Sequence, residues 1–95
     1  MNTDGLLDRV WTESYTCYDF ANEVYTFITG EIKDTFNMSE IAEPENLCFV
    51  LMDNGYQTHT GIMHEDKLFH LALSGVQKVE LDIIKLHFRS IRFYK

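Results

Sequence analysis

The chain has 95 residues, 45% of them hydrophobic and 14% aromatic, which predicts a single packed domain over residues 1–95 and excludes a disordered chain. Its formal net charge of −7 argues against nucleic acid as a partner, because phosphate recognition needs clustered basic side chains. No segment is apolar over a membrane-spanning length, and residues 1–11 lack the pattern of a secretory signal, so we expect cytoplasmic synthesis without membrane insertion.

The N-terminal third is predicted to contain two helices. Residues 3–11 favour a short one. Residues 17–29 favour a longer one, because apolar side chains recur there on one helical face. This stripe consists of Cys17, Phe20, Ala21, Val24, Phe27 and Ile28.

The longer helix has sequence signals at both ends. Thr16 is the expected N-cap, with Asp19 three residues later as its capping-box partner. Gly30 is the expected C-terminal stop. Cys17 therefore falls at the first helical position.

A polar loop with a helical turn is expected over residues 31–46, which contain the only proline. Four strands are expected after it, over residues 47–52, 57–63, 67–73 and 76–80. Asp53-Asn54-Gly55 is a strong hairpin signal between the first two strands.

A short helix over residues 81–86 and a closing strand over residues 91–94 complete the pattern. Helices followed by a succession of strands predict an α+β domain, with N-terminal helices packed on an antiparallel β-meander.

The two cysteines lie in different settings and do not make a disulfide framework. Cys48 belongs to the apolar run LCFVLM and is expected to be a small buried side chain. Cys17 lies among polar groups at a helix start, where free amides and the helix dipole favour a thiolate. Cys17 is therefore a candidate nucleophile.

Two histidines are candidate partners of that thiol. If a two- or four-residue turn centred on Glu65 and Asp66 joins the strands, Gly61 lies opposite His70. His59 and His70 then share one face as diagonal neighbours, and Gly61 leaves room between them. An odd-numbered turn would put the two imidazoles on opposite faces.

Four motifs resemble the NlpC-type papain-like cysteine peptidases of the NlpC/P60 superfamily, and the short phage-encoded members most closely. They are CYDF at residues 17–20, HTGI at 59–62, LFHLALSGV at 68–76 and RFYK at 92–95. The similarity extends from about residue 15 to residue 95, and it implies a minimal papain-like fold.

The resemblance also implies a Cys-His-His triad, with Cys17 as nucleophile, His59 as general base and His70 as the orienting residue. Members of this family cleave amide bonds in peptidoglycan stem peptides, typically next to γ-D-glutamate, and need no cofactor. Tyr15, Tyr18 and Asp19 flank the cysteine and are candidate substrate contacts, with packing as the alternative for the two tyrosines.

The remaining histidines are expected to have no role. His64 is predicted to be solvated in a turn, and His87 to lie at the surface or at a helix end. Zinc binding by His59, His64 and His70 together with a carboxylate is an alternative, but no Cys-x-x-Cys or His-Glu-x-x-His spacing supports it.

Two other functions compete with the hydrolase. The first is a structural component of a phage virion or tail, with phage tail proteins as partners and little or no turnover. The second is an acyltransferase or deamidase that uses the same triad. Without a signal peptide, the protein would be virion-associated or exported by other means.

Overall fold

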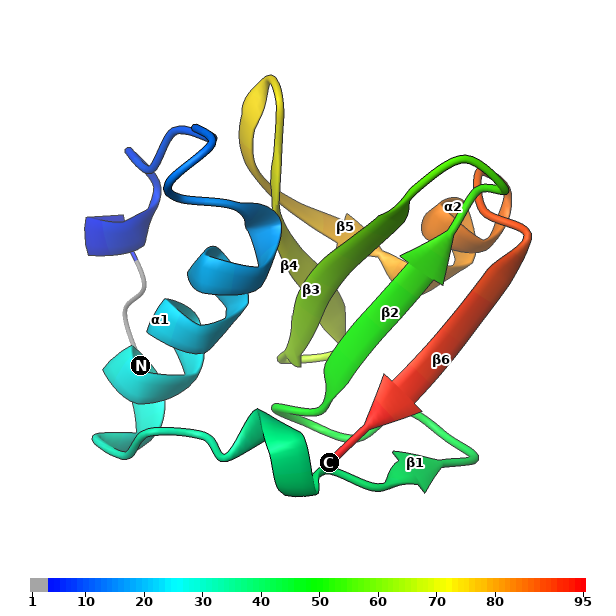
Figure 1. The fold of residues 1–95 in the computed structure, drawn as a ribbon, viewed down its shortest axis with the longest axis horizontal. Helices are drawn as coiled ribbons and strands as arrows, with labels where there is room; N and C mark the ends of the chain where they lie inside the picture. The colour runs from blue at the N-terminus through cyan, green and yellow to red at the C-terminus, as the bar shows by residue number, and fades with distance from the viewer. Residues whose placement is uncertain (1–3) are drawn as a thin grey trace.

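A six-stranded antiparallel sheet forms the centre of the molecule, with a helix packed on each of its faces (Figure 1). The computed structural model describes residues 4–95. The strands follow the order β1-β6-β2-β3-β4-β5 across the sheet. Their bounds are β1 Glu40–Ile41, β2 Phe49–Asp53, β3 Thr58–His64, β4 Lys67–Ala72, β5 Gly75–Glu80 and β6 Ser90–Tyr94. The expected α+β class is confirmed, and β2 to β5 form a meander.

The strands predicted from residue 47 onwards lie within two residues of their expected bounds. The hairpin between β2 and β3 is closed by side chains of the predicted turn: the backbone N–H of Gly55 donates to Asp53 Oδ1 at 2.7 Å. The two-residue strand β1, which pairs with β6, was not predicted, because so short a strand has no detectable alternation.

Helix α1 (Cys17–Thr29) has the predicted bounds, and Gly30 ends it with a positive φ of 76°. It packs on β3 and β4 and buries Phe20, Ala21 and Val24. Phe27 is 46% exposed, so the predicted apolar stripe is too wide. Phe27 instead borders a surface cavity together with the polar side chains of Asn22, Glu23 and Thr26.

The predicted helix over residues 3–11 is wrong over its described part. Residues Asp4–Leu6 form a single 3₁₀ turn, η1, and residue 3 lies outside the described residues. Leu6 is fully buried, and Arg9 forms two hydrogen bonds, at 2.9 and 2.8 Å, to the carboxylate of Glu23 in α1. These tertiary contacts hold the segment along α1, in place of a short helix that would be unstable alone.

Two shorter elements complete the chain: η2 (Thr35–Asn37) and α2 (Leu81–Lys85). The helical turn expected in the loop over residues 31–46 and the short helix near residue 81 are thus both found. None of the helices within residues 4–95 combines the length and the apolar character needed to cross a membrane.

The sheet separates two clusters of buried side chains. The cluster under α1 contains Leu6, Phe20, Ala21, Val24, Phe49, Ile62, Phe69 and Leu71. The cluster on the α2 side contains Cys48, Val50, Met52, Met63, Leu68, Ile84 and Phe93. Because side chains alternate along a strand, Thr60, Ile62 and His64 face α1, whereas His59, Gly61 and Met63 face α2.

Candidate active site

The turn between β3 and β4 has two residues, Glu65 and Asp66, whose φ angles are 54° and 67°. The register that follows places Gly61 opposite His70, as predicted. His59 and His70 therefore lie diagonally on one face of the sheet.

Strands β3 and β4 part at this point. Their pairing ends at Gly61 and His70, whereas β4 continues with β5 as far as Ala72. β3 likewise continues with β2 to Thr58. Figure 1 shows the two hairpins diverging beyond the paired segment. We call this opening the fork.

The thiol of Cys17 lies at the fork. The backbone N–H of Thr60, one residue beyond the last β3–β4 pair, donates to Cys17 Sγ at 3.4 Å. The sulfur thus takes the position that a β4 carbonyl would occupy if the ladder continued. The helix start is held there by Asp19, whose carboxylate accepts a 2.9 Å hydrogen bond from the backbone N–H of Thr16.

The two histidines form a hydrogen-bonded pair. His59 Nε2 lies 2.7 Å from His70 Nδ1, and the two rings meet edge to face. The ring of Phe88 stacks on the ring of His59 at a centroid distance of 6.4 Å. A Cβ at Gly61 would lie 3.1 Å from the Cβ of His70, so the glycine makes the space that the pair needs.

Burial keeps both imidazoles neutral near pH 7. It lowers the pKa of His59, and it lowers the pKa of His70 to about 4, with the neighbouring His59 as the second cause. His70 is 5% exposed. Because both rings are neutral, one of them must donate in the shared hydrogen bond and the other must accept.

Cys17 and His59 open into the same cavity of about 370 Å³. The other residues around it are Trp11, Thr16, Gln57, Thr58, Leu71 and Leu73. A second cavity, of about 390 Å³, is bordered by His59, His70 and Phe88. His59 thus lines both the cavity of the thiol and the cavity of His70, as a base that serves a nucleophile and is oriented by a third group would.

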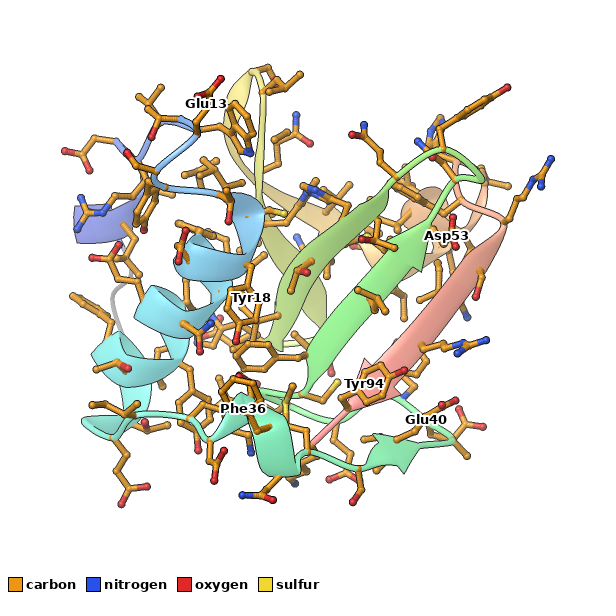
Figure 2. The ribbon with its side chains drawn as sticks, in the orientation of Figure 1. Glu13, Tyr18, Phe36, Glu40, Asp53 and Tyr94 are labelled. Atoms are coloured by element: carbon orange, nitrogen blue, oxygen red, sulfur yellow. The ribbon has the colours of Figure 1, made fainter. Side chains whose placement is uncertain are left out.

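The three candidate substrate residues have different surroundings. Tyr15 packs against the core under α1, and its hydroxyl donates to Glu23. The carboxylate of Asp19 accepts a hydrogen bond from the backbone N–H of Thr16, the N-cap residue of α1. Tyr18, which is labelled in Figure 2, is 43% exposed. It borders a cavity of about 250 Å³ between α1 and β2, and its hydroxyl forms a hydrogen bond with the hydroxyl of Thr35. Of the three, Tyr18 is the one that lines a cavity near the thiol.

Most residues of the cavity wall were not predicted to belong to the site. Trp11, Gln57 and Leu73 stand at the ends of the helix predicted over residues 3–11 and of the strands predicted over residues 57–63 and 67–73. In the structure they lie in turns or irregular segments, so the predicted periods gave no sign that they share a cavity. Only the isolated tryptophan, unusual in so short a chain, could have served as a signal.

The prediction for His64 is wrong. Its side chain is 4% exposed and faces α1, where it stacks on Phe69 and its Nδ1 lies 3.0 Å from Lys78 Nζ. The cause is that β3 extends to residue 64, so that this histidine belongs to the strand and not to the turn. His87 is exposed just after α2, as predicted.

The alternative zinc site needs three histidines that the sheet separates, because His64 faces α1 while His59 and His70 face α2. Within residues 4–95, no group of three or more His, Cys, Asp or Glu side chains is arranged to hold a metal ion.

Comparisons of the chain with family models, with curated proteins and with solved structures give no match. The observations that bear on function are therefore the geometry of the fork and the sequence motifs.

Proposed function

We propose that this protein is a cysteine amidase or endopeptidase with a minimal papain-like fold. One observation carries the proposal: a thiol at a helix start and a hydrogen-bonded histidine pair converge where two strands of the sheet part. In this proposal Cys17 is the nucleophile, His59 the general base and His70 the residue that orients His59.

Two features of the fork favour the thiolate of Cys17. The first amides of α1 have no partners within the helix and carry the positive end of its dipole. The N–H of Thr60 adds a donor directly at the sulfur. Both stabilise a negative charge on Sγ and so support its nucleophilicity.

The reaction follows from these roles. His59 accepts the thiol proton, and Sγ attacks an amide carbonyl to form a tetrahedral intermediate. In this proposal the backbone N–H of Cys17 stabilises the oxyanion. The side chains of Trp11 and Gln57, which line the same cavity as Cys17, are candidates for a second donor. His59 then protonates the leaving amine, and water hydrolyses the thioester to release the acid and restore the thiol.

The proposed substrate is a bacterial cell-wall stem peptide. This part of the proposal rests on the motifs that resemble the NlpC-type peptidases. The described residues that line the thiol cavity include no Asp, Glu, Lys or Arg, so recognition would depend on apolar contacts and hydrogen bonds more than on ion pairs.

The experiment compares the two cysteines. Cys17 should react with iodoacetamide well before Cys48, which is fully buried and whose pKa is raised by burial. Peptide mapping after short exposure identifies the labelled site, and incubation with purified muropeptides tests for cleavage. Cys17→Ser should keep the melting temperature and abolish cleavage, and faster labelling of Cys48 would contradict the proposal.

The structural virion component remains a second candidate, favoured by the net charge of −7, because an acidic protein gains no attraction to anionic wall polymers. It predicts sluggish alkylation of Cys17. An acyltransferase or deamidase predicts fast alkylation without hydrolysis of muropeptides. The two measurements together therefore separate the three functions.

A further inference from the structure

His70 has a buried ring nitrogen that forms no hydrogen bond with any of residues 4–95. Its Nδ1 faces His59, whereas its Nε2 is inaccessible to solvent and has no partner within that range. A buried polar group without a partner is costly, and such a group in a native site needs an explanation.

The protonation of this nitrogen decides whether His59 can act as a base. If Nε2 of His70 carries the hydrogen, Nδ1 is free to accept from His59 Nε2–H, and His59 keeps a bare Nδ1 for the thiol proton. If Nε2 of His70 is bare, the hydrogen lies on its Nδ1 and is donated to His59. The proton of neutral His59 then occupies the nitrogen that should accept from Cys17.

Gln77 is the side chain best placed to make that choice. It lies directly opposite His70 in the β4–β5 ladder, and so on the same face of the sheet. Its amide nitrogen donates to Ser74 Oγ at 3.2 Å, so the amide oxygen, which is the acceptor of this side chain, takes no part in that bond. The side chain of Gln77 also opposes the fall in the pKa of His70, as an acceptor near an imidazole N–H does.

We propose that Gln77 is a positioning residue whose amide oxygen accepts the Nε2–H of His70. This contact selects the tautomer of His70 in which His59 can take the proton of Cys17, so the inference rests on the proposed function of His59. Gln77 thereby becomes the fourth group of the proposed site, after Cys17, His59 and His70. Ser74 orients the amide of Gln77 through their hydrogen bond.

The test measures the tautomer and the reactivity separately. Nitrogen-15 spectra of the histidine side chains at neutral pH report which ring nitrogen of His70 carries the proton. The pH dependence of the rate at which iodoacetamide alkylates Cys17 shows whether His59 accepts the thiol proton. The spectrum and the alkylation rate are measured for the parent protein and for the variants Gln77→Met and Gln77→Glu. Lys78→Met is the control, because Lys78 is the next residue along β5 but faces α1.

Gln77→Met removes the acceptor with little change in volume. It should shift the His70 proton towards Nδ1 and slow alkylation by about 5- to 30-fold, the factor that corresponds to one lost hydrogen bond to a buried group. Gln77→Glu keeps an acceptor and should retain both the parent spectrum and the parent rate. Lys78→Met should change neither.

An unchanged His70 spectrum in Gln77→Met would overturn the inference, whatever the alkylation rate. Loss of the parent tautomer in Gln77→Glu would also overturn it, because an acceptor would then not suffice. A sluggish Cys17 in the parent, unaffected by His59→Ala, would contradict the proposed function instead, and the spectra would still decide the role of Gln77.

Discussion

The two ends of the β3–β4 hairpin consist of the same two strands, but one end is fully paired and belongs to the core, whereas the other is open and borders the candidate site. At the turn end, the ladder runs without interruption from Ile62 and Phe69 to His64 and Lys67. At the other end it stops at Gly61 and His70, and the free edge of β3 meets the start of α1. Where β3 and β4 are paired, their side chains pack into the core. Where the pairing ends, the backbone N–H of Thr60 is left to donate to Cys17.

The histidines illustrate the same difference. His64, at the closed end, is 4% exposed and is buried against Phe69. His59, five residues earlier on the same strand, borders two cavities. It faces α2, whereas Cys17 comes from the helix on the opposite face. The two groups can share an opening only because the sheet is parted between them.

The largest effect is expected from variants of the histidine pair at the open end. His59→Ala should remove most of the muropeptide cleavage rate, because general acid–base catalysis contributes about 10²–10⁴-fold. His59→Asn should be equally inactive, since an amide cannot exchange a proton near neutral pH. His70→Asn and His70→Gln should keep measurable activity, and His70→Ala should lose clearly more.

The rate constants of these five variants are compared on one substrate at one pH, with the melting temperature of each as the folding control. If His70→Asn is as inactive as His59→Ala, the orienting role is wrong. An active His59→Asn would place the base elsewhere.

A second prediction concerns stability in acid. The pKa of His70 is about 4 in the folded protein and about 6.5 when unfolded, so both states are neutral above pH 6.5. Between pH 6.5 and 4 the unfolded chain takes up the proton and the folded protein does not. The free energy of unfolding should fall over this range, by about 3 kcal/mol from His70 alone.

Urea denaturation at successive pH values measures this loss. His70→Gln should remove much of the dependence, whereas His87→Gln, at an exposed position, should leave it unchanged. If the free energy of unfolding of the parent protein did not change with pH over this range, His70 would not be buried as a neutral ring at the open end of the hairpin.

Much of the fold could be predicted from local sequence signals, and so could the placement of His59 and His70 on one face of the sheet. The period of α1, its cap at Thr16 and its stop at Gly30 act within a few residues, so its bounds could be predicted. The relation between His59 and His70 could be predicted as well, because a two-residue turn and the alternation of side chains determine the register.

Other features depend on contacts between distant segments. The fork follows no periodicity in either strand, so the sequence did not reveal that β3 and β4 part beside Cys17. Trp11 is brought to the cavity by a segment that Arg9 ties to Glu23, fourteen residues away in the chain. His64 was misassigned because a difference of one residue in the end of a strand changes a solvated turn position into a buried one.

A third prediction tests the boundary between the closed and open ends. Gly61→Ala would place a Cβ 2.7 Å from Leu68 Cδ1 and 3.1 Å from His70 Cβ. We expect a loss of about 1–3 kcal/mol in the free energy of unfolding, the usual range for overpacking. Because His70 must move, alkylation of Cys17 should also slow. Gly5→Ala is the control, since its Cβ would contact nothing within 4 Å.

The smallest effect is expected at the closed end, where the outcome should be the opposite in sign. Glu65 and Asp66 both have positive φ, which is costly for most L-residues and typical of a type I′ turn. The double variant Glu65→Asn, Asp66→Gly supplies the residues that this turn prefers. It should raise the free energy of unfolding by about 0.5–1 kcal/mol. The rate of Cys17 alkylation should stay unchanged, because the ladder between the turn and the fork remains paired. Parallel urea denaturation and alkylation measurements check both expectations. A stabilised protein with an altered alkylation rate would show that the two ends of the hairpin are coupled, so the closed end would then belong to the site as well.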